Sequence, residues 1–417
     1  FRRVLFRSHS QGQPTVELFE FNDLPVLGTT EGGQEIKLGG LSGLFYEGTD
    51  PATGNLKFVT VPDRGPNGEP TDVDGDGSNE RPFALPDYQA QVIRFELNPS
   101  SGEIAITETI FLTRQDSTTP ITGLPNIAGV DEEPVDLSGN LLPLDEFGAD
   151  LEGVVIAADG TFWMVDEYRP AIYHFDTDGV LIDRFVPQGT AALAGAAVGT
   201  FGTESLPEEY ANRRRNRGFE AVALDPDENI LYAFIQTPLQ NPDRATSDSS
   251  DVIRILGIDT TTGNAVAEYV YLLEDPAFRS GGRVDKIGDA VYAEDGKLFV
   301  IERDSAVGDT AKKFIFQIDL TAATNLLAPD APTLPTGSTL EQLSADDLDA
   351  LGIEAVNKIK VTNLPSIGYL AGDKPEGLAL LDDGKLAVLN DNDFGVLEQE
   401  IPVDGSDRKS TRLNSSH

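Results

Sequence analysis

Short apolar runs recur along the chain. Each run is preceded by an acidic or small polar residue and then by a small residue. This recurring motif occurs as Leu41-Ser42-Gly43-Leu44, Leu151-Glu152-Gly153-Val154, Phe219-Glu220-Ala221-Val222, Gly288-Asp289-Ala290-Val291 and Pro375-Glu376-Gly377-Leu378. In the last four copies a turn rich in Asp, Asn and Gly leads to a second apolar run. The second runs end in polar residues, among them Asp166-Glu167, Glu302-Arg303 and Asn390-Asp391. The pattern predicts a repeated β-hairpin that delivers polar side chains to one shared place.

The second unit has the clearest pattern. Its apolar runs predict strands at 154–157, 162–166, 172–176 and 181–186. Asp159-Gly160 and Asp178-Gly179 supply the two-residue turns that favour tight antiparallel pairing. Four short antiparallel strands in about 35 residues are typical of one propeller blade.

The other units follow the same plan with longer loops. Strands are expected at 43–46, 56–61, 91–97 and 104–112; at 221–224, 231–235, 252–259 and 265–272; at 290–293, 298–302, 314–319 and 356–362; and at 378–381 and 386–390. Runs at 16–21 and 34–38 are expected to complete the last unit. Short helices are predicted after Pro207, with Ser205 as the cap, and after Ser344.

These elements predict an all-β fold, a β-propeller of four-stranded antiparallel blades with long inserted loops and short helices. Five blades are visible in the sequence, and a sixth is left open. A β-sandwich or β-helix fits less well, because the innermost strands begin with polar residues.

The two ends differ from the rest of the chain in charge. Phe1–Ser8 and Asp407–His417 carry net positive charge in an otherwise acidic chain. They resemble translated sequencing-adaptor segments. We therefore expect a single domain over 9–406, derived from a gene fragment truncated on both sides, so that a missing signal peptide says nothing about localisation.

Composition excludes several kinds of chemistry. The 417 residues contain no Cys, and the three His are His9, His174 and His417. Disulfides, thiol catalysis and Cys-bound zinc are therefore excluded, and a His-based triad or metal site would depend almost wholly on His174. No apolar run approaches the ~20 residues that span a bilayer, so membrane insertion is not expected. The net charge of −39 repels nucleic acid and attracts divalent cations. A purely solubilising role for this charge, as in a salt-adapted or secreted protein, remains open.

One loop carries the pattern of a calcium site. Asp72, Asp74 and Asp76 alternate with small residues, and a glycine follows the third acid. Such spacing lets a loop wrap a hard cation with oxygen ligands. The twelfth position, where an EF-hand has its glutamate, is Phe83, so Glu80 is expected to complete the site. A solvated acidic turn is the alternative.

The recurring motif predicts a second metal site. Innermost strands line the channel of a propeller, so the acids that begin them should converge at one mouth: Glu152, Glu220, Asp289 and Glu376. Neighbouring carboxylates repel one another unless protons or a cation neutralise them, and Ca²⁺ is the expected ion. The alternative is that each acid binds backbone amides within its own blade.

Arginines stand beside these acids. Arg64 follows Asp63, Arg81 follows Glu80, Arg217 lies three residues before Glu220, and Arg303 follows Glu302. Guanidinium groups match the geometry of phosphate, which favours an oxyanion clamp at Arg64 or Arg217. Structural ion pairs are the alternative for each arginine.

Several motifs together resemble a known family. They are GLSGL with DRGPNG, RPFALPDYQAQVIRFEL, DLEGVVIAADGTFWMVDEYRPAIYHFDTDG, RRNRGFEAVAL and KPEGLALLDDGKLAVLNDNDFG. Over about residues 38–395 the chain is similar to the phytase-like family, also called "esterase-like activity of phytase". The resemblance implies a β-propeller associated with phosphoester or ester hydrolysis, often in secreted or cell-surface bacterial proteins.

The sequence thus leads to a hypothesis of function. We expect a secreted, periplasmic or cell-surface enzyme that hydrolyses small phosphorylated molecules with Ca²⁺, binds no nucleic acid and acts as a monomer. Ca²⁺ would be held by Glu152, Glu220 and Glu376, with Arg64 or Arg217 as the phosphate clamp and Glu302 or Asp391 as the base. The alternatives are a lactonase or carboxylesterase on the same metal, and a non-enzymatic adhesion module stabilised by Ca²⁺.

Overall fold

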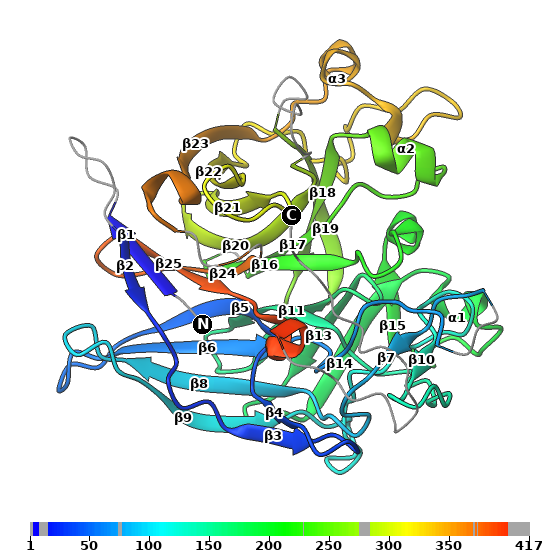
Figure 1. Ribbon diagram of the computed structural model, residues 1–417. Coiled ribbons are helices and arrows are strands. Elements are labelled where there is room, and N and C mark those ends of the chain that lie inside the picture. The colour runs from blue at the N-terminus through cyan, green and yellow to red at the C-terminus, as the bar shows by residue number, and fades with distance from the viewer. Residues whose placement is uncertain are drawn as a thin grey trace.

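The computed structural model describes residues 3–7, 16–73, 77–227, 229–274, 284–369, 372 and 374–398. Within these residues most regular structure is β, with a few short helices (Figure 1). Consecutive strands of each repeated unit are hydrogen-bonded neighbours, mostly antiparallel. The prediction of an all-β fold built from repeated hairpins is confirmed.

The first four repeated units each form one sheet. The first contains β5 (Leu41–Thr49), β6 (Leu56–Pro62), β8 (Gln91–Leu97) and β9 (Ile104–Phe111). The second contains β11 (Leu151–Ile156), β12 (Phe162–Asp166), β13 (Ala171–Phe175), β14 (Leu181–Pro187) and the added parallel strand β15 (Thr203–Leu206). The third contains β16 (Phe219–Asp225), β17 (Ile230–Ile235), β18 (Val252–Asp259) and β19 (Asn264–Leu272). The fourth contains β20 (Lys286–Glu294), β21 (Lys297–Arg303), β22 (Lys313–Asp319) and β23 (Asn357–Asn363).

The last sheet joins the two ends of the described chain. Its order is β2 (Val16–Phe19), β1 (Arg3–Arg7), β25 (Lys385–Asn390) and β24 (Pro375–Leu380). The prediction that the run from Val16 completes this unit is confirmed. The same prediction for residues 34–38 is wrong, because β4 (Glu35–Lys37) pairs instead with β3 (Val26–Thr29). The third place in the sheet is taken by Arg3–Arg7, which we expected to lie outside the fold; whether those residues are adaptor-derived stays a prediction.

The remaining elements are short. They are β7 (Arg81–Pro82), β10 (Pro134–Val135), α1 (Thr190–Leu193), α2 (Arg244–Ser249), α3 (Ala345–Leu351), and the 3₁₀ helices η1 (Glu208–Asn212), η3 (Leu340–Gln342), η4 (Leu364–Ile367) and η5 (Asp393–Glu398). Helix α3 begins as predicted, with the Ser344 side chain accepting a hydrogen bond from the Asp347 amide at 3.2 Å. Ser205 is not a helix cap: it lies in β15 and donates to the Gly263 carbonyl at 3.0 Å.

The innermost strands form a closed ring, which is the propeller arrangement. Each of β5, β11, β16 and β20 contacts the innermost strand of the next unit, and β24 contacts β5. Apolar side chains fill the space between neighbouring sheets; the largest cluster joins the second, third and fourth units through residues such as Val165, Val222 and Val300. Burial of these side chains supplies the main force that holds the units together.

The recurring motif corresponds to a β-bulge, which the sequence did not reveal. Strand register slips at every copy, and the extra residue is Glu152 in β11, Glu220 in β16 and Glu376 in β24. Such β-bulges redirect one side chain out of the normal alternation. The small residue that follows allows neighbouring inner strands to approach closely, since a Cβ added to Gly153 would lie 2.9 Å from Val222 Cγ1. The bulge therefore presents the acid, and the small residue permits the ring to close.

Candidate metal centre and active-site cavity

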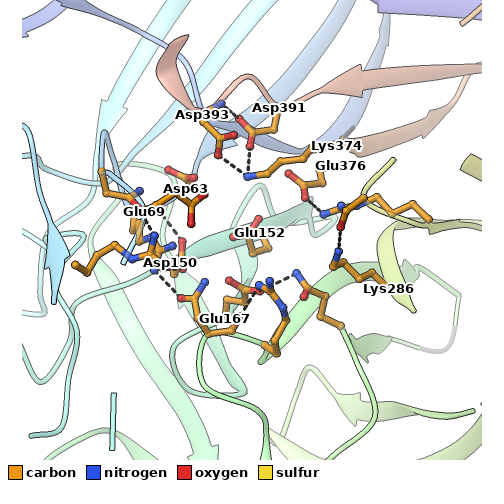
Figure 2. Close-up of a pocket in the computed structure, with 18 of the residues that line it drawn as sticks. Asp63, Glu69, Asp150, Glu152, Glu167, Lys286, Lys374, Glu376, Asp391 and Asp393 are labelled. Atoms are coloured by element: carbon orange, nitrogen blue, oxygen red, sulfur yellow. Dashed lines mark hydrogen bonds and ion pairs between the residues drawn. The ribbon is translucent and has the colours of Figure 1, made fainter. Parts of the chain in front are cut away.

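A polar cavity of about 180 Å³ lies where the innermost strands begin (Figure 2). Water occupies about 30 Å³ per molecule in the liquid, so this volume can hold an ion together with a small polar group. Eight carboxylates and six basic side chains line the cavity, giving a formal charge of −2 when all are ionised. They are Asp63, Glu69, Asp150, Glu152, Glu167, Glu376, Asp391 and Asp393, with Arg64, Arg81, Arg217, Lys286, Arg303 and Lys374.

Three of the acids form what we call the Glu152 cluster: Asp150, Glu152 and Glu167. One carboxylate oxygen from each lies within 4.8 Å of the others, and all three side chains are buried. Asp150 accepts a hydrogen bond from the Arg64 amide at 3.1 Å, and Glu167 accepts from Gln236 at 2.7 Å and Arg217 at 3.1 Å. Glu152 is 7% exposed and has no hydrogen-bond or ion-pair partner among the described residues. Figure 2 shows it near the middle of the cavity, with no dashed line reaching it.

The electrostatics of this cluster favour a bound cation. Burial raises the pKa of Glu152 well above its usual value, and the charges of Glu220 and Asp150 raise it further. Burial also raises the pKa of Glu167 to about 7, against the opposing effect of Arg217. Oxygen ligands of Ca²⁺ lie about 2.3–2.6 Å from the ion, so ligands up to about 5 Å apart can share one. The three carboxylates therefore fit such an ion.

A second group of acids lies on another wall of the cavity, and we call it the Lys374 cluster: Asp63, Asp391, Asp393 and Lys374. The ammonium of Lys374 contacts Asp391 at 3.0 Å and also pairs closely with Asp393. Burial alone would lower the pKa of Lys374, but these two carboxylates outweigh it and raise the pKa. Burial raises the pKa of Asp391 to about 8, although Lys374 opposes the shift. Here the chain provides its own cation.

The cavity brings together five of the residues predicted to share the site. Glu152, Glu376, Arg64, Arg217 and Asp391 all line it. Glu376 is paired with Arg303 rather than free, and Arg64 donates to Glu132 at 2.9 Å and Asn216 at 2.7 Å.

Glu220 lies behind the cavity wall and is not among its lining residues. It is 1% exposed, accepts a hydrogen bond from Gln236 at 2.5 Å and lies 3.5 Å from Arg303. This position suits it to hold Arg303 and Gln236 in place better than to bind an ion in the cavity.

Two predicted residues point elsewhere. Asp289 accepts hydrogen bonds from the amides of Ala290 at 2.8 Å and Leu378 at 2.6 Å. It binds backbone amides, as the alternative proposed, but it links two neighbouring blades and does not act within its own blade alone. Glu302 accepts from Tyr271 at 2.5 Å and from Lys358 at 2.8 Å. Successive side chains in a strand face opposite sides, and Arg303 takes the cavity side. The expectation that Asp289 and Glu302 share this cavity is therefore wrong.

Only part of the acidic loop lies among the described residues. Asp74 and Asp76 lie outside the described residues. Asp72 accepts a hydrogen bond from the Gly77 amide at 3.1 Å, and Glu80 accepts from the Val73 amide and the Ser78 hydroxyl, both at 3.0 Å. Calcium binding by this loop stays a prediction.

Sequence reasoning missed Asp150, Glu167, Asp393, Lys374 and Lys286. The signal for Glu167 was present, because the pair Asp166-Glu167 ends a second apolar run. The sequence does not say which member faces the cavity. In the structure Asp166 turns away to Arg184 at 3.1 Å, and Glu167 takes the cavity side.

Fold and cavity together define a class: a β-propeller with an acidic, cation-compatible cavity where its innermost strands begin. The chain belongs to the phytase-like family described as "Esterase-like activity of phytase", whose model matches residues 36–394. A relative from Arthroderma benhamiae, described as an uncharacterized secreted protein, is 29% identical over 258 residues. The match covers 52% of this chain and 48% of the relative, so the chain spans about half the length of that protein.

The solved structures that match this chain share little sequence identity with it. The PQQ-bound aldose sugar dehydrogenase of Streptomyces coelicolor is 12% identical with a TM-score of 0.35, over 89% of this chain and 93% of that one. A putative 6-phosphogluconolactonase from Bacteroides uniformis is 13% identical with a TM-score of 0.33, over 93% and 88%. Among the described residues, helices are all too short or too polar to cross a membrane.

Proposed function

We propose that the protein is a hydrolase of phosphate esters that works with Ca²⁺ bound at the Glu152 cluster. The observation that carries this proposal is the Glu152 carboxylate, which is buried beside two other buried carboxylates and has no partner in the part of the chain that the structure describes. An isolated buried charge is costly, so a site of this kind favours a ligand that neutralises it. Family membership supports hydrolysis of an ester bond as the reaction class.

The described residues suit distinct roles in this reaction. Asp150, Glu152 and Glu167 would hold the ion. When bound, Ca²⁺ would supply Lewis-acid polarisation of a phosphoryl oxygen and acidify a water molecule. Arg64 and Arg217 line the cavity and can orient phosphoryl oxygens through paired N–H donors. Asp391, with its pKa raised to about 8, titrates near neutral pH as a proton-transfer group must. Water provides the oxygen that replaces the ester alcohol at phosphorus, and the alcohol leaves with a proton.

The test is an assay of the purified chain before EDTA treatment, after it, and after Ca²⁺ is restored. Substrates are p-nitrophenyl phosphate, phytate and p-nitrophenyl acetate. We expect hydrolysis of phosphate esters only when Ca²⁺ is present. Turnover of the acetate alone would favour the carboxylesterase or lactonase alternative. No turnover with a Ca²⁺-dependent melting temperature would favour the adhesion module, and full activity after EDTA treatment would contradict the metal site.

Finer features belong to the same proposal. The ring of innermost strands β5, β11, β16, β20 and β24 supports a count of five blades. The secreted relative supports an extracellular location, and the net charge of −39 supports a small-molecule partner in place of nucleic acid. We also propose a monomer, which light scattering of the purified chain would test.

A further inference from the structure

Lys286 occupies an electrostatically unfavourable position in the cavity. It begins β20 and lies directly across the strand pair from Arg303, and both side chains line the cavity. Figure 2 shows Lys286 at one side of the cavity. Like charges at directly opposed positions of an antiparallel pair destabilise it. The two cations therefore call for a compensating negative charge.

The two cations differ in how the chain compensates them. Arg303 is paired with Glu376 and lies 3.5 Å from Glu220. The ammonium of Lys286 donates to the hydroxyl of Ser305, which is neutral, and its carboxylate neighbour Asp285 is 3.7 Å away with its side chain 30% exposed. Burial lowers the pKa of Lys286, and the neighbouring charge of Arg303 lowers it further. Lys286 is thus a largely buried cation whose ion-pair partner among the described residues, Asp285, is distant and partly exposed.

We propose that Lys286, Ser305 and Arg303 form an anion subsite that binds the phosphoryl group of the substrate. An ammonium, a hydroxyl and a guanidinium together offer donors for several oxygens of one tetrahedral anion. A phosphoryl dianion offsets the repulsion between Lys286 and Arg303, whereas a neutral carboxylic ester brings no charge to do so. This inference rests on the proposed function for its substrate class, and it selects phosphate esters over carboxylic esters.

The experiment uses calorimetry to measure how the EDTA-treated protein binds inorganic phosphate. The result therefore requires neither bound calcium nor turnover. We compare the native chain with Lys286→Met and with Lys297→Met. Lys297 begins β21 at the far end of the same hairpin and serves as the matched control. Lys286→Met should weaken phosphate binding by at least about tenfold, the usual scale for a lost charged hydrogen bond, and Lys297→Met should not.

Thermal unfolding separates this role from a structural one. In phosphate-free buffer Lys286→Met should melt at or above the temperature of the native chain, because the repulsion with Arg303 is removed. Phosphate should raise the melting temperature of the native chain by more than that of Lys286→Met, whose binding is weaker. In turnover, Lys286→Met should raise KM for p-nitrophenyl phosphate about tenfold, and Lys297→Met should not.

The outcomes distinguish this inference from the proposed function. Native-like phosphate binding by Lys286→Met, or equal losses in both variants, would overturn the subsite even if Ca²⁺-dependent hydrolysis is observed. Absence of phosphate binding by the native chain would also overturn it. Lys286-dependent phosphate binding in a protein that hydrolyses no ester would support the subsite and contradict the proposed function.

Discussion

The Glu152 cluster and the Lys374 cluster face the same cavity, yet they are neutralised differently. In the Lys374 cluster, one ammonium contacts Asp391 and Asp393. In the Glu152 cluster, Arg64 and Arg217 approach the outer members Asp150 and Glu167, and the central carboxylate has no partner among the described residues. Both groups therefore have cations supplied by the chain, and they differ in one respect: among the described residues no such cation contacts Glu152.

This difference indicates which group is built for a ligand. A buried carboxylate with its own lysine is neutralised within the chain, and removal of one partner leaves an uncompensated charge. A buried carboxylate without a partner lowers stability until a proton or an ion arrives. The first arrangement keeps the cavity in shape, and the second gives it affinity for a cation. The following predictions test this assignment, from the largest expected effect to the smallest.

Glu152→Gln should reduce Ca²⁺-dependent hydrolysis by about 100-fold or more, since even the outer partners of metal ligands contribute 10–100-fold. In EDTA the same variant should be at least as stable as the native chain, because an unpartnered buried charge has been removed. Activity assays and calorimetric Ca²⁺ titration measure the first effect, and urea unfolding measures the second. Native Ca²⁺ affinity in the variant would refute the assignment.

Lys374→Met should destabilise the protein by about 3 kcal/mol at pH 8, because it leaves the carboxylates of Asp391 and Asp393 without their counter-charge. Chemical unfolding of the metal-free chain gives the value. Combining it with Asp391→Asn should restore part of the loss, since one of the two uncompensated charges is then gone. If Lys374→Met and Glu152→Gln have the same effect on stability, the contrast between the clusters does not hold.

The pH dependence of stability follows from the raised pKa values. Glu167 titrates at about 7 in the folded chain but near 4.5 when unfolded, so between these values the folded state holds a proton that the unfolded chain has released. The free energy of unfolding of metal-free protein should therefore fall as pH rises from about 5 to 7, by up to about 1.4 kcal/mol per unit for this proton. Saturating Ca²⁺ should reduce this fall, because the ion replaces the proton. Unfolding series with and without Ca²⁺ measure it, and identical slopes would count against the site.

Glu302→Gln serves as a control outside both clusters. It weakens the contacts with Tyr271 and Lys358, so we expect a loss of about 1–3 kcal/mol in stability. Because this carboxylate faces away from the cavity, kcat should stay within about twofold of the native value. A large fall in kcat in a folded variant would restore Glu302 as a candidate base.

Much of the fold was predictable from local pattern. Alternating apolar runs, Asp-Gly turns and the capping serine Ser344 act over a few residues, so the strands of the first four units and the start of α3 were found from the sequence. The partner of residues 34–38 was not found, because pairing between distant strands depends on which edges are left open in three dimensions. The same holds for Arg3–Arg7, whose basic composition gives no sign of a place between β2 and β25.

By itself, the sequence determined the repeated hairpin, the acid near the start of four of the five inner strands, and the exclusion of cysteine and most histidine chemistry. These follow from residue type and short-range periodicity. The tertiary structure alone decided which acids meet. Bulges aim Glu152 and Glu376 at the cavity, Asp289 turns to backbone amides, and Asp150, Glu167 and Lys374 complete the site from strand ends and loops. Bulge geometry and ring closure bring residues far apart in the chain, such as Glu152 and Glu376, to one cavity, and no local pattern in the sequence reveals that proximity.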